Sequence, residues 1–329
     1  MPAFIISRLL QAIPVLLVVG FISFAMFSFV GDPVTAMLGQ DFTEAQRIAL
    51  VHKLGLDQPF FVQYGKFMWA ATQGDYGLSY RLARPVSSLI LERLPATTEL
   101  ALTSALMALA IGIPMGVYTG IHRNSFASRA FMVFSLVGVS LPTFVIGILL
   151  ILVFAVVLGW LPSFGRGDVV HFSHWSTGFL TLSGLKALIL PAITLGLFQM
   201  TLIMRLVRSE MLEVLRSDYI KFARARGLSQ RAINFGHALK NTLVPVITIV
   251  GLQLGGLIGF SIITETVFQW PGMGLLLVQS IQVADIPVMS AYLLLIAVVF
   301  MAINLIVDLL YYAVDPRLRM GRRVTSAAR

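Results

Sequence analysis

Residues 131–158 read FMVFSLVGVSLPTFVIGILLILVFAVVL, a run of 28 residues without a charged side chain. At about 1.5 Å per helical residue, the run is long enough to cross the roughly 30 Å of hydrocarbon in a bilayer. Backbone groups in lipid need partners within their own segment, and the alternating pattern of barrel strands is missing here. The run therefore predicts a transmembrane helix.

Similar apolar runs recur along the chain, near 9–30, 97–120, 187–207, 242–263 and 288–313. The composition agrees, because 57% of the 329 residues are hydrophobic and only 12% are charged. A soluble domain of this size could not bury so much apolar surface. We expect an all-α integral membrane protein with about six transmembrane helices.

Two features of these runs refine the expectation. The first run follows Arg8, is longer than the apolar part of a secretory signal and has no clear cleavage motif, so we expect a retained signal anchor. Small residues such as Gly112, Gly116, Gly251 and Gly259 favour close packing between helices.

The basic residues predict the orientation of the chain. The formal net charge is +9, but the lysines and arginines lie beside apolar runs, which favours membrane topology over nucleic-acid binding. With a cytoplasmic N-terminus, sixteen of them fall inside and eight outside, where six acidic residues in 31–94 offset them. We expect both termini in the cytoplasm.

The chain has no cysteine, which excludes disulfides and thiolate sites.

Four segments follow from this topology. Residues 1–30 form the cytoplasmic N-terminus and first span, and 316–329 form a basic cytoplasmic tail. Residues 31–94 are expected to form a small extracytoplasmic helical subdomain, because Thr43-Glu44-Ala45-Gln46 is typical of a helix start. Residues 95–315 form the membrane core, with a short cytoplasmic helix near 217–228.

That short helix is the most informative polar stretch. Ser217 or Asp218 can cap it, Gly227 marks its end, and Ser229 can begin the next helix. Its small and apolar side chains between arginines suit docking in a groove on another protein: Tyr219, Ile220, Phe222, Ala223 and Ala225 beside Arg224 and Arg226. A basic loop that serves only topology is the alternative, and the residues alone leave both open.

The run DYIKFARARGL at 218–228, followed by HALKN at 237–241, closely resembles the coupling-loop signature of ABC importer permeases of the dipeptide and oligopeptide family. These permeases depend on a binding protein, and the resemblance is to their first permease subunit. It extends over nearly the whole chain through short pieces in matching order: Arg8-Leu9-Leu10, Gly31-Asp32-Pro33, Leu56-Asp57-Gln58-Pro59, Gln63-Tyr64, Gly74-Asp75-Tyr76-Gly77-Leu78-Ser79, Glu265-Thr266-Val267-Phe268, Pro271-Gly272-Met273-Gly274 and Asp315-Pro316-Arg317-Leu318-Arg319.

The broad ABC-permease pattern is only partly kept. Ala223 and Gly227 match it, whereas Lys221 and Phe222 replace a glutamate and an alanine. Leu239-Lys240 stands where the broad pattern has Leu-Pro, as is common in the peptide branch. The departures favour that branch.

The resemblance implies a type I ABC importer permease fold in a bacterial inner membrane. It implies a heterodimer with a second homologous permease, two cytoplasmic subunits that bind ATP and Mg, an extracytoplasmic solute-binding protein and a peptide substrate. The chain has no Gly-x-x-x-x-Gly-Lys-Ser/Thr loop, so we expect a transport subunit without its own ATPase site. We predict no catalytic, metal or cofactor site in this chain and no nucleic-acid partner.

The resemblance also implies roles for three sets of residues. The ATPase-coupling set consists of Asp218, Tyr219, Ala223, Arg224, Ala225, Gly227 and Leu228. A possible outer gate consists of Glu265, Phe268, Pro271 and Gly272, and possible pathway residues are Gln253 and Ser261. Two alternatives stay open: an ion-coupled secondary transporter that uses Glu99 or Asp308 as a proton site, and an importer of the same family for nickel or another small solute.

Overall fold

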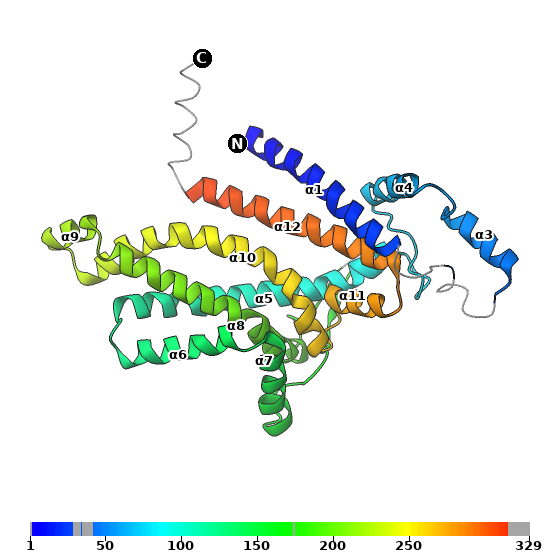
Figure 1. Ribbon diagram of the computed structural model, residues 1–329. Coiled ribbons are helices and arrows are strands. Elements are labelled where there is room, and N and C mark those ends of the chain that lie inside the picture. The colour runs from blue at the N-terminus through cyan, green and yellow to red at the C-terminus, as the bar shows by residue number, and fades with distance from the viewer. Residues whose placement is uncertain (1, 29–33, 35–41, 174, 315–329) are drawn as a thin grey trace, which may run out of the picture. The chain divides into compact units, whose positions relative to one another are not determined.

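The computed structural model describes residues 2–28, 34, 42–173 and 175–314, and helices make up most of it (Figure 1). Contacts divide the chain into two compact units. Unit 1 comprises Met1–Thr98, Gly165–Leu185 and Gln269–Met301, and unit 2 comprises Glu99–Phe164, Lys186–Phe268 and Ala302–Arg329. The expected tail at 316–329 lies outside the described residues, as do the motifs at 31–33 and 315–319.

Among the described residues, four helices are long and apolar enough to cross a membrane. They are α1 (Pro2–Ser28), α5 (Val86–Ile121), α8 (Leu182–Val214) and α12 (Ile286–Val314). Two bent helix pairs raise the number to six if each is one span: α6 (Phe126–Ser140) with the segment Thr143–Val157, and the two parts of α10 (Leu239–Val267). Six apolar segments were expected, and all six are helical.

The run at 131–158, predicted to form one transmembrane helix, is broken. Within 131–158, α6 ends at Ser140 and α7 (Thr143–Leu150) continues into η1 (Ile151–Val157), with a bend of 110° between the two parts. The cause is Pro142, because a residue before proline is pushed out of the helical conformation. Leu141 accordingly has φ −94° and ψ 136°. The prediction of one continuous helix is corrected here.

Unit 2 is held together by close contacts between α5 and α8. Three glycines recur every four residues along α5, and a Cβ on any of them would lie within 3 Å of an α8 atom: 2.9 Å from Met200 O for Gly112, 2.7 Å from Met204 O for Gly116, and 2.7 Å from Met211 Cβ for Gly120. This confirms the predicted packing role of Gly112 and Gly116. Gly251 likewise packs against Val307, whereas a Cβ on Gly259 would meet nothing within 4 Å in this chain, so the packing predicted for Gly259 stays a prediction.

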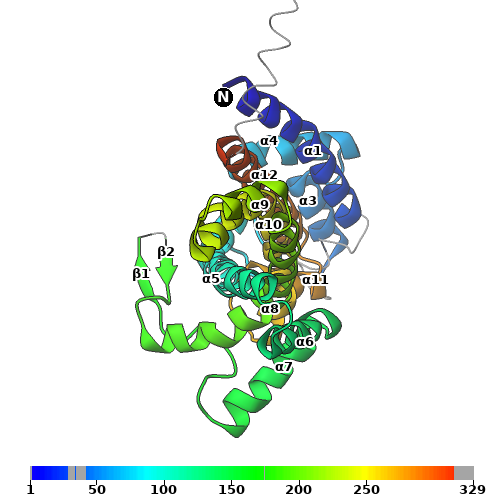
Figure 2. The same cartoon turned by 90° about the vertical axis from the view of Figure 1, so that its left-hand side faces the viewer.

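Two short helical segments between α8 and α10 also belong to unit 2. Helix α9 (Asp218–Ala225) follows α8, and η2 (Ala232–Ala238) leads directly into α10 (Figure 2). Their buried residues Ile220, Ala223, Ile233 and Ala238 join the apolar core that α5 and α8 form.

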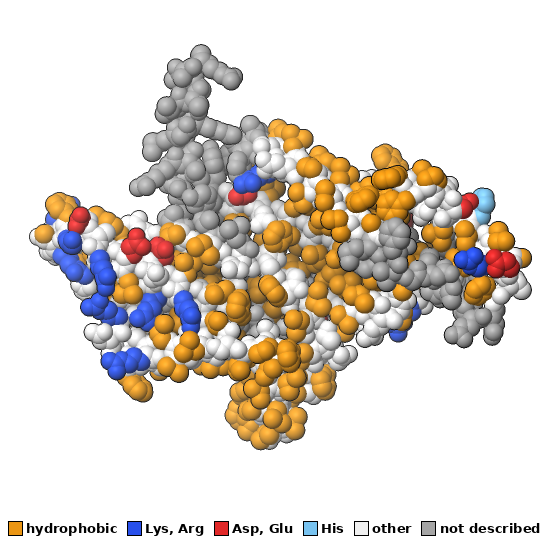
Figure 3. Space-filling model, in the orientation of Figure 1, with side chains coloured by type: hydrophobic (Ala, Val, Ile, Leu, Met, Phe, Trp, Pro, Cys, Tyr) orange, Lys and Arg blue, Asp and Glu red, His pale blue; other side chains and the backbone are white. Residues whose placement is uncertain are grey.

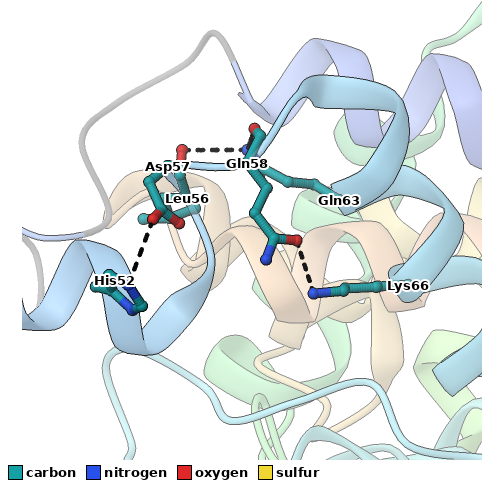
Figure 4. A network of polar contacts seen from close by, with 6 residues as sticks. All are labelled: His52, Leu56, Asp57, Gln58, Gln63 and Lys66. Atoms are coloured by element: carbon teal, nitrogen blue, oxygen red, sulfur yellow. Dashed lines mark hydrogen bonds and ion pairs between the residues drawn. The ribbon is translucent and has the colours of Figure 1, made fainter.

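Unit 1 contains the segment expected to form a helical subdomain. α3 (Glu44–Leu54) begins with a capping box in which Thr43 N–H donates to Gln46 Oε1 at 2.9 Å, as its sequence predicted. It is followed by α4 (Phe60–Thr72), and the turn between them is fastened by side chains (Figure 4). Gln63 Nε2 donates to the carbonyl oxygens of Leu56 and Gln58, at 3.2 and 2.8 Å.

The all-α expectation needs one small correction, in the loop before α8. Strands β1 (Val170–Phe172) and β2 (Trp175–Thr177) form an antiparallel hairpin in which Val170 pairs with Thr177 and Phe172 with Trp175. The Arg166 guanidinium stabilises it by donating to Ser176 Oγ at 2.9 Å and to the Ser176 carbonyl oxygen at 2.8 Å. Unit 1 ends with the short α11 (Met273–Gln282) and the first part of α12.

Candidate functional site

The short helix α9 begins where α8 ends in a turn. Ser217 is its N-cap residue with extended backbone angles, and its hydroxyl donates to the Val214 carbonyl oxygen at 2.5 Å instead of capping α9. Asp218 lies in the first turn, where a negative charge stabilises the helix dipole. Its carboxylate accepts a hydrogen bond from Lys221 Nζ at 2.8 Å, and this contact lowers the pKa of Asp218.

The end of α9 is a complete Schellman motif. Gly227 N–H donates to the Arg224 carbonyl oxygen at 2.9 Å, and Leu228 N–H donates to that of Ala223 at 3.3 Å. Gly227 has φ +78°, in the left-handed region that side chains disfavour. The sequence therefore located both ends of the helix correctly, and Ser229 begins the next helix by accepting from Ala232 N–H at 3.3 Å.

Helix α9 has a buried and an exposed face. Ile220 and Ala223 are buried in the core of unit 2, and Tyr219 OH accepts from Asn241 Nδ2 at 2.6 Å, which ties α9 to α10. The structure therefore differs from the sequence expectation that Ala223 and Ile220 lie on an outward docking surface, because both side chains point into the core. They position α9.

The outward surface of α9 consists of the other side chains. Phe222 is 64% exposed, and the Arg226 guanidinium lies 5.8 Å from the centre of its ring. The exposed members of the coupling set are Asp218, Tyr219, Arg224, Ala225, Gly227 and Leu228. Basic side chains gather at the end of unit 2 that carries α9 (Figure 3). An exposed apolar ring within such a basic surface suits contact with another protein.

The segment predicted as a possible outer gate is tightly packed. On unit 2, Glu265 is fully buried with its Oε1 3.2 Å from Ser261 Oγ, while Phe268 packs against Gly147. On unit 1, Trp270 is buried and its Nε1 donates to the Ala96 carbonyl oxygen at 2.9 Å. These contacts fix the segment in the conformation described.

The rest of the gate segment leads into α11. Gly272 is the N-cap residue of α11 and is buried, whereas Pro271 is half-buried. Thr97 Oγ1 accepts from the Met273 backbone N–H at 2.8 Å, so a side chain of α5 caps α11.

The two predicted pathway residues lie in different environments of α10. Gln253 is exposed, whereas Ser261 is fully buried and donates to the Ile258 carbonyl oxygen at 2.7 Å. The structure therefore does not bring them together. Glu99 is buried on α5 and Asp308 is half-buried on α12.

Comparison with known families covers most of the chain. Residues 112–320 match the family described as binding-protein-dependent transport system inner membrane component, and residues 1–101 match the N-terminal family of the same membrane components. The first match alone includes more than half of the chain and contains α9.

The chain belongs to this family.

The relatives described here align with the permease over nearly the full length of both chains. The dipeptide transport system permease protein DppB of Alkalihalophilus pseudofirmus is 40% identical over 332 residues, covering 97% of the permease and 100% of that relative. The di/tripeptide transport system permease protein DppB of Pseudomonas aeruginosa is 40% identical over 336 residues, covering 98% and 100%. The glutathione transport system permease protein GsiC of Salmonella paratyphi A is 39% identical over 318 residues, covering 96% and 98%.

A solved structure shares the fold of the permease. A chain of the MetNI methionine ABC transporter, in inward-facing conformations, matches with a TM-score of 0.54 and 20% sequence identity. The match covers 69% of the permease and 96% of that chain. The permease therefore has the type I ABC importer fold and is a multi-pass protein of the inner membrane.

Asp285 is a buried carboxylate of the permease that the sequence did not single out. In unit 1 it accepts from Ser79 Oγ at 2.5 Å, from Tyr80 N–H at 3.1 Å and from Arg81 N–H at 3.4 Å. Burial, and then the Asp285 charge, raises the pKa of Tyr80 to about 12. Asp285 also stands directly before α12, and Ala-Asp-Ile-Pro at 284–287 is a helix-start signal that could have located it.

Proposed function

We propose that the permease is one of two membrane subunits of an ATP-driven importer of di- and oligopeptides. The observation that carries this proposal is the identity of about 40%, over nearly the full chain, to relatives whose names state dipeptide or di/tripeptide transport. The glutathione relative is consistent with it, since glutathione is itself a tripeptide. The whole complex would hydrolyse ATP, with ATP and Mg bound by partner subunits.

The proposed topology places α9 and both termini in the cytoplasm. Eight basic residues lie in 204–241, compared with none in 264–287. Since lysine and arginine accumulate in cytoplasmic loops, the basic end of unit 2 would face inward (Figure 3). The loop that carries β1 and β2 and the segment between α10 and α11 would then face outward.

In this complex α9 would transmit movement from a cytoplasmic ATPase subunit. Its buried side chains Ile220 and Ala223 join it to the core of unit 2, and its exposed Phe222 and Arg224 are free to contact another subunit. A push on α9 would therefore move the helices to which it is packed. The Schellman turn at Gly227 keeps α9 at a fixed angle to η2.

The remaining partners and residues follow from the same proposal. A second homologous permease, two ATPase subunits and an outer solute-binding protein would complete the importer. Glu265, Phe268, Pro271 and Gly272 would form part of the outer closure through their packing, and Ser261 would support Glu265. Gln253 would be available to a substrate or to the second permease, because its side chain is exposed.

Substrate class is tested by uptake into cells that carry the complete importer. Labelled dipeptide, labelled tripeptide and nickel would each be offered to cells with the intact gene and to cells without it. We expect ATP-dependent uptake of the peptides that disappears with the gene. Nickel uptake without peptide uptake would overturn the peptide proposal while leaving the importer intact.

A further inference from the structure

Helix α4 has two apolar faces, of which only one is covered. The covered face packs on α1, where the rings of Phe60, Tyr64 and Phe67 lie 5.3 to 6.0 Å from those of Phe21 and Phe24. The other face exposes Trp69 by 70% and Val62 by 45%. Phe61 lies at the edge of this face, 73% exposed, with its ring stacked on that of Phe21 at 6.3 Å. No residue of α4 is fully buried. Large aromatic side chains facing water in this way would be unfavourable.

The contacts with α1 fix how deep α4 lies in the membrane. The apolar span of α1 runs from Ile5 to Ala25, 21 residues, or about 31 Å, which matches the hydrocarbon thickness. Tyr64 OH donates to the Leu17 carbonyl oxygen at 2.7 Å, and a Cβ on Gly20 would lie 2.6 Å from Met68 Sδ. Leu17 lies eight residues before Ala25, about 12 Å inside the span. The middle of α4 therefore lies beside hydrocarbon-spanning residues.

The surface of α1 itself continues the exposed face. Only 6% of its span is buried within the chain, and Leu17, Val18 and Ile22 are exposed. Hydrophobic side chains accordingly cover both α1 and α4 (Figure 3). We propose that the face of α4 formed by Phe61, Val62, Gly65, Lys66 and Trp69 contacts lipid, and that α4 lies within the bilayer half that holds the C-terminal end of α1.

The polar groups of α4 fit a position in lipid. Lys66 is its one charged residue, and its Nζ donates to Gln58 Oε1 at 2.7 Å, in the turn that precedes the helix (Figure 4). Gln63 is satisfied by carbonyl oxygens of the same turn. A lysine can extend its apolar stem through lipid and place its ammonium group at the polar surface. The α3–α4 turn would therefore mark the headgroup level, with α3 outside it.

The proposal changes the expected role of residues 31–94. They were expected to form an extracytoplasmic subdomain, but α4 shares the depth of a membrane span. A second permease or a binding protein could also cover exposed aromatic residues. Lipid is favoured because Leu17 lies well inside the span, at a level that a soluble protein does not reach, and because the apolar surface continues onto α1.

The chain has no cysteine, so one introduced cysteine gives this chain a single labelling site, and the importer with the unaltered chain serves as the blank for labels on partner subunits. The variants Phe61→Cys and Trp69→Cys would be labelled in the assembled importer in lipid nanodiscs. Relaxation by oxygen, which concentrates in hydrocarbon, would be compared with relaxation by a water-soluble nickel chelate. Ile48→Cys on α3, which is 60% exposed, is the matched control.

We expect oxygen to relax the labels at 61 and 69 more than the nickel chelate does, and the reverse order at 48. Stronger relaxation by nickel at 61 and 69 would place α4 in water and overturn the proposal. Immobile labels that respond to neither agent would mean that a protein partner covers the face, which also overturns it. If Phe61→Cys fails to assemble, Val62→Cys reports from the same face.

Discussion

Gly227 ends α9 with φ +78°, and open space surrounds the position of a Cβ there. Replacing it with valine would therefore introduce backbone strain rather than a clash, at a cost of about 1–2 kcal/mol. We expect Gly227→Val to reduce ATP-driven uptake while basal ATP hydrolysis continues, because α9 would lose its fixed angle. Gly227→Asn, which tolerates the left-handed conformation, should keep uptake.

The control for valine itself is Gly236→Val, since Gly236 in η2 also has open space around it but no positive φ. Uptake and substrate-stimulated ATPase would be measured together in the reconstituted complex. If Gly227→Val leaves both unchanged, the turn does not contribute to coupling.

Asp285 is the residue whose loss should destabilise unit 1 most directly. Asp285→Ala would leave the N–H groups of Tyr80 and Arg81 and the Ser79 hydroxyl without their acceptor. We expect a loss of about 1–3 kcal/mol in the free energy of unfolding, measured as a lower Tm of the purified complex. Asp75→Ala removes an exposed carboxylate of the same unit, which accepts one solvent-exposed hydrogen bond, from Gly77 N–H at 2.9 Å, and should lower the Tm less. Equal Tm values for the two variants would contradict the proposed role of Asp285.

At the level of whole elements, the contact between α5 and α8 depends on the glycines of α5. A Cβ at Gly116 would lie 2.6 Å from Val207 Cβ and 2.7 Å from Met204 O, so both helices would have to shift. We expect Gly116→Ala to cost about 1–3 kcal/mol through overpacking, seen as a lower Tm. Gly259→Ala on α10 meets no neighbour and should be neutral or stabilising by about 0.5–1 kcal/mol. A Tm that falls equally in both variants would show that helix packing at Gly116 is not the cause.

The elements also show how far the sequence could predict the fold. Long apolar runs located the spans, and the cap residues Thr43, Ser217 and Gly227 located helix ends, because these signals are local. The bend at Pro142 has a local cause too, but its angle depends on the packing of α7 against α10, for example of Gly147 against Val267. The burial of Ala223 and the pairing of Ser79 with Asp285 join distant segments, and no short pattern encodes them.

At the scale of the whole molecule, the question is where the energy for transport comes from. The sequence has no phosphate-binding loop, and the membrane charges Glu99 and Asp308 are the candidates for ion coupling. Under the proposed function, partner ATPase subunits supply this energy, so the permease alone should transport nothing. Purified permease in liposomes should therefore take up no dipeptide, with or without a proton gradient.

Affinity purification from the native membrane in mild detergent tests whether partner subunits supply the energy for transport. We expect the permease to bring with it a second six-span permease and ATPase subunits, identified by mass spectrometry, and the recovered complex to take up dipeptide only with ATP and a solute-binding protein. Glu99→Gln should then leave ATP dependence intact, because under the proposed function ATP hydrolysis drives transport. Recovery of the permease alone, together with proton-driven uptake that Glu99→Gln or Asp308→Asn abolishes, would instead establish an ion-coupled transporter built on an importer fold.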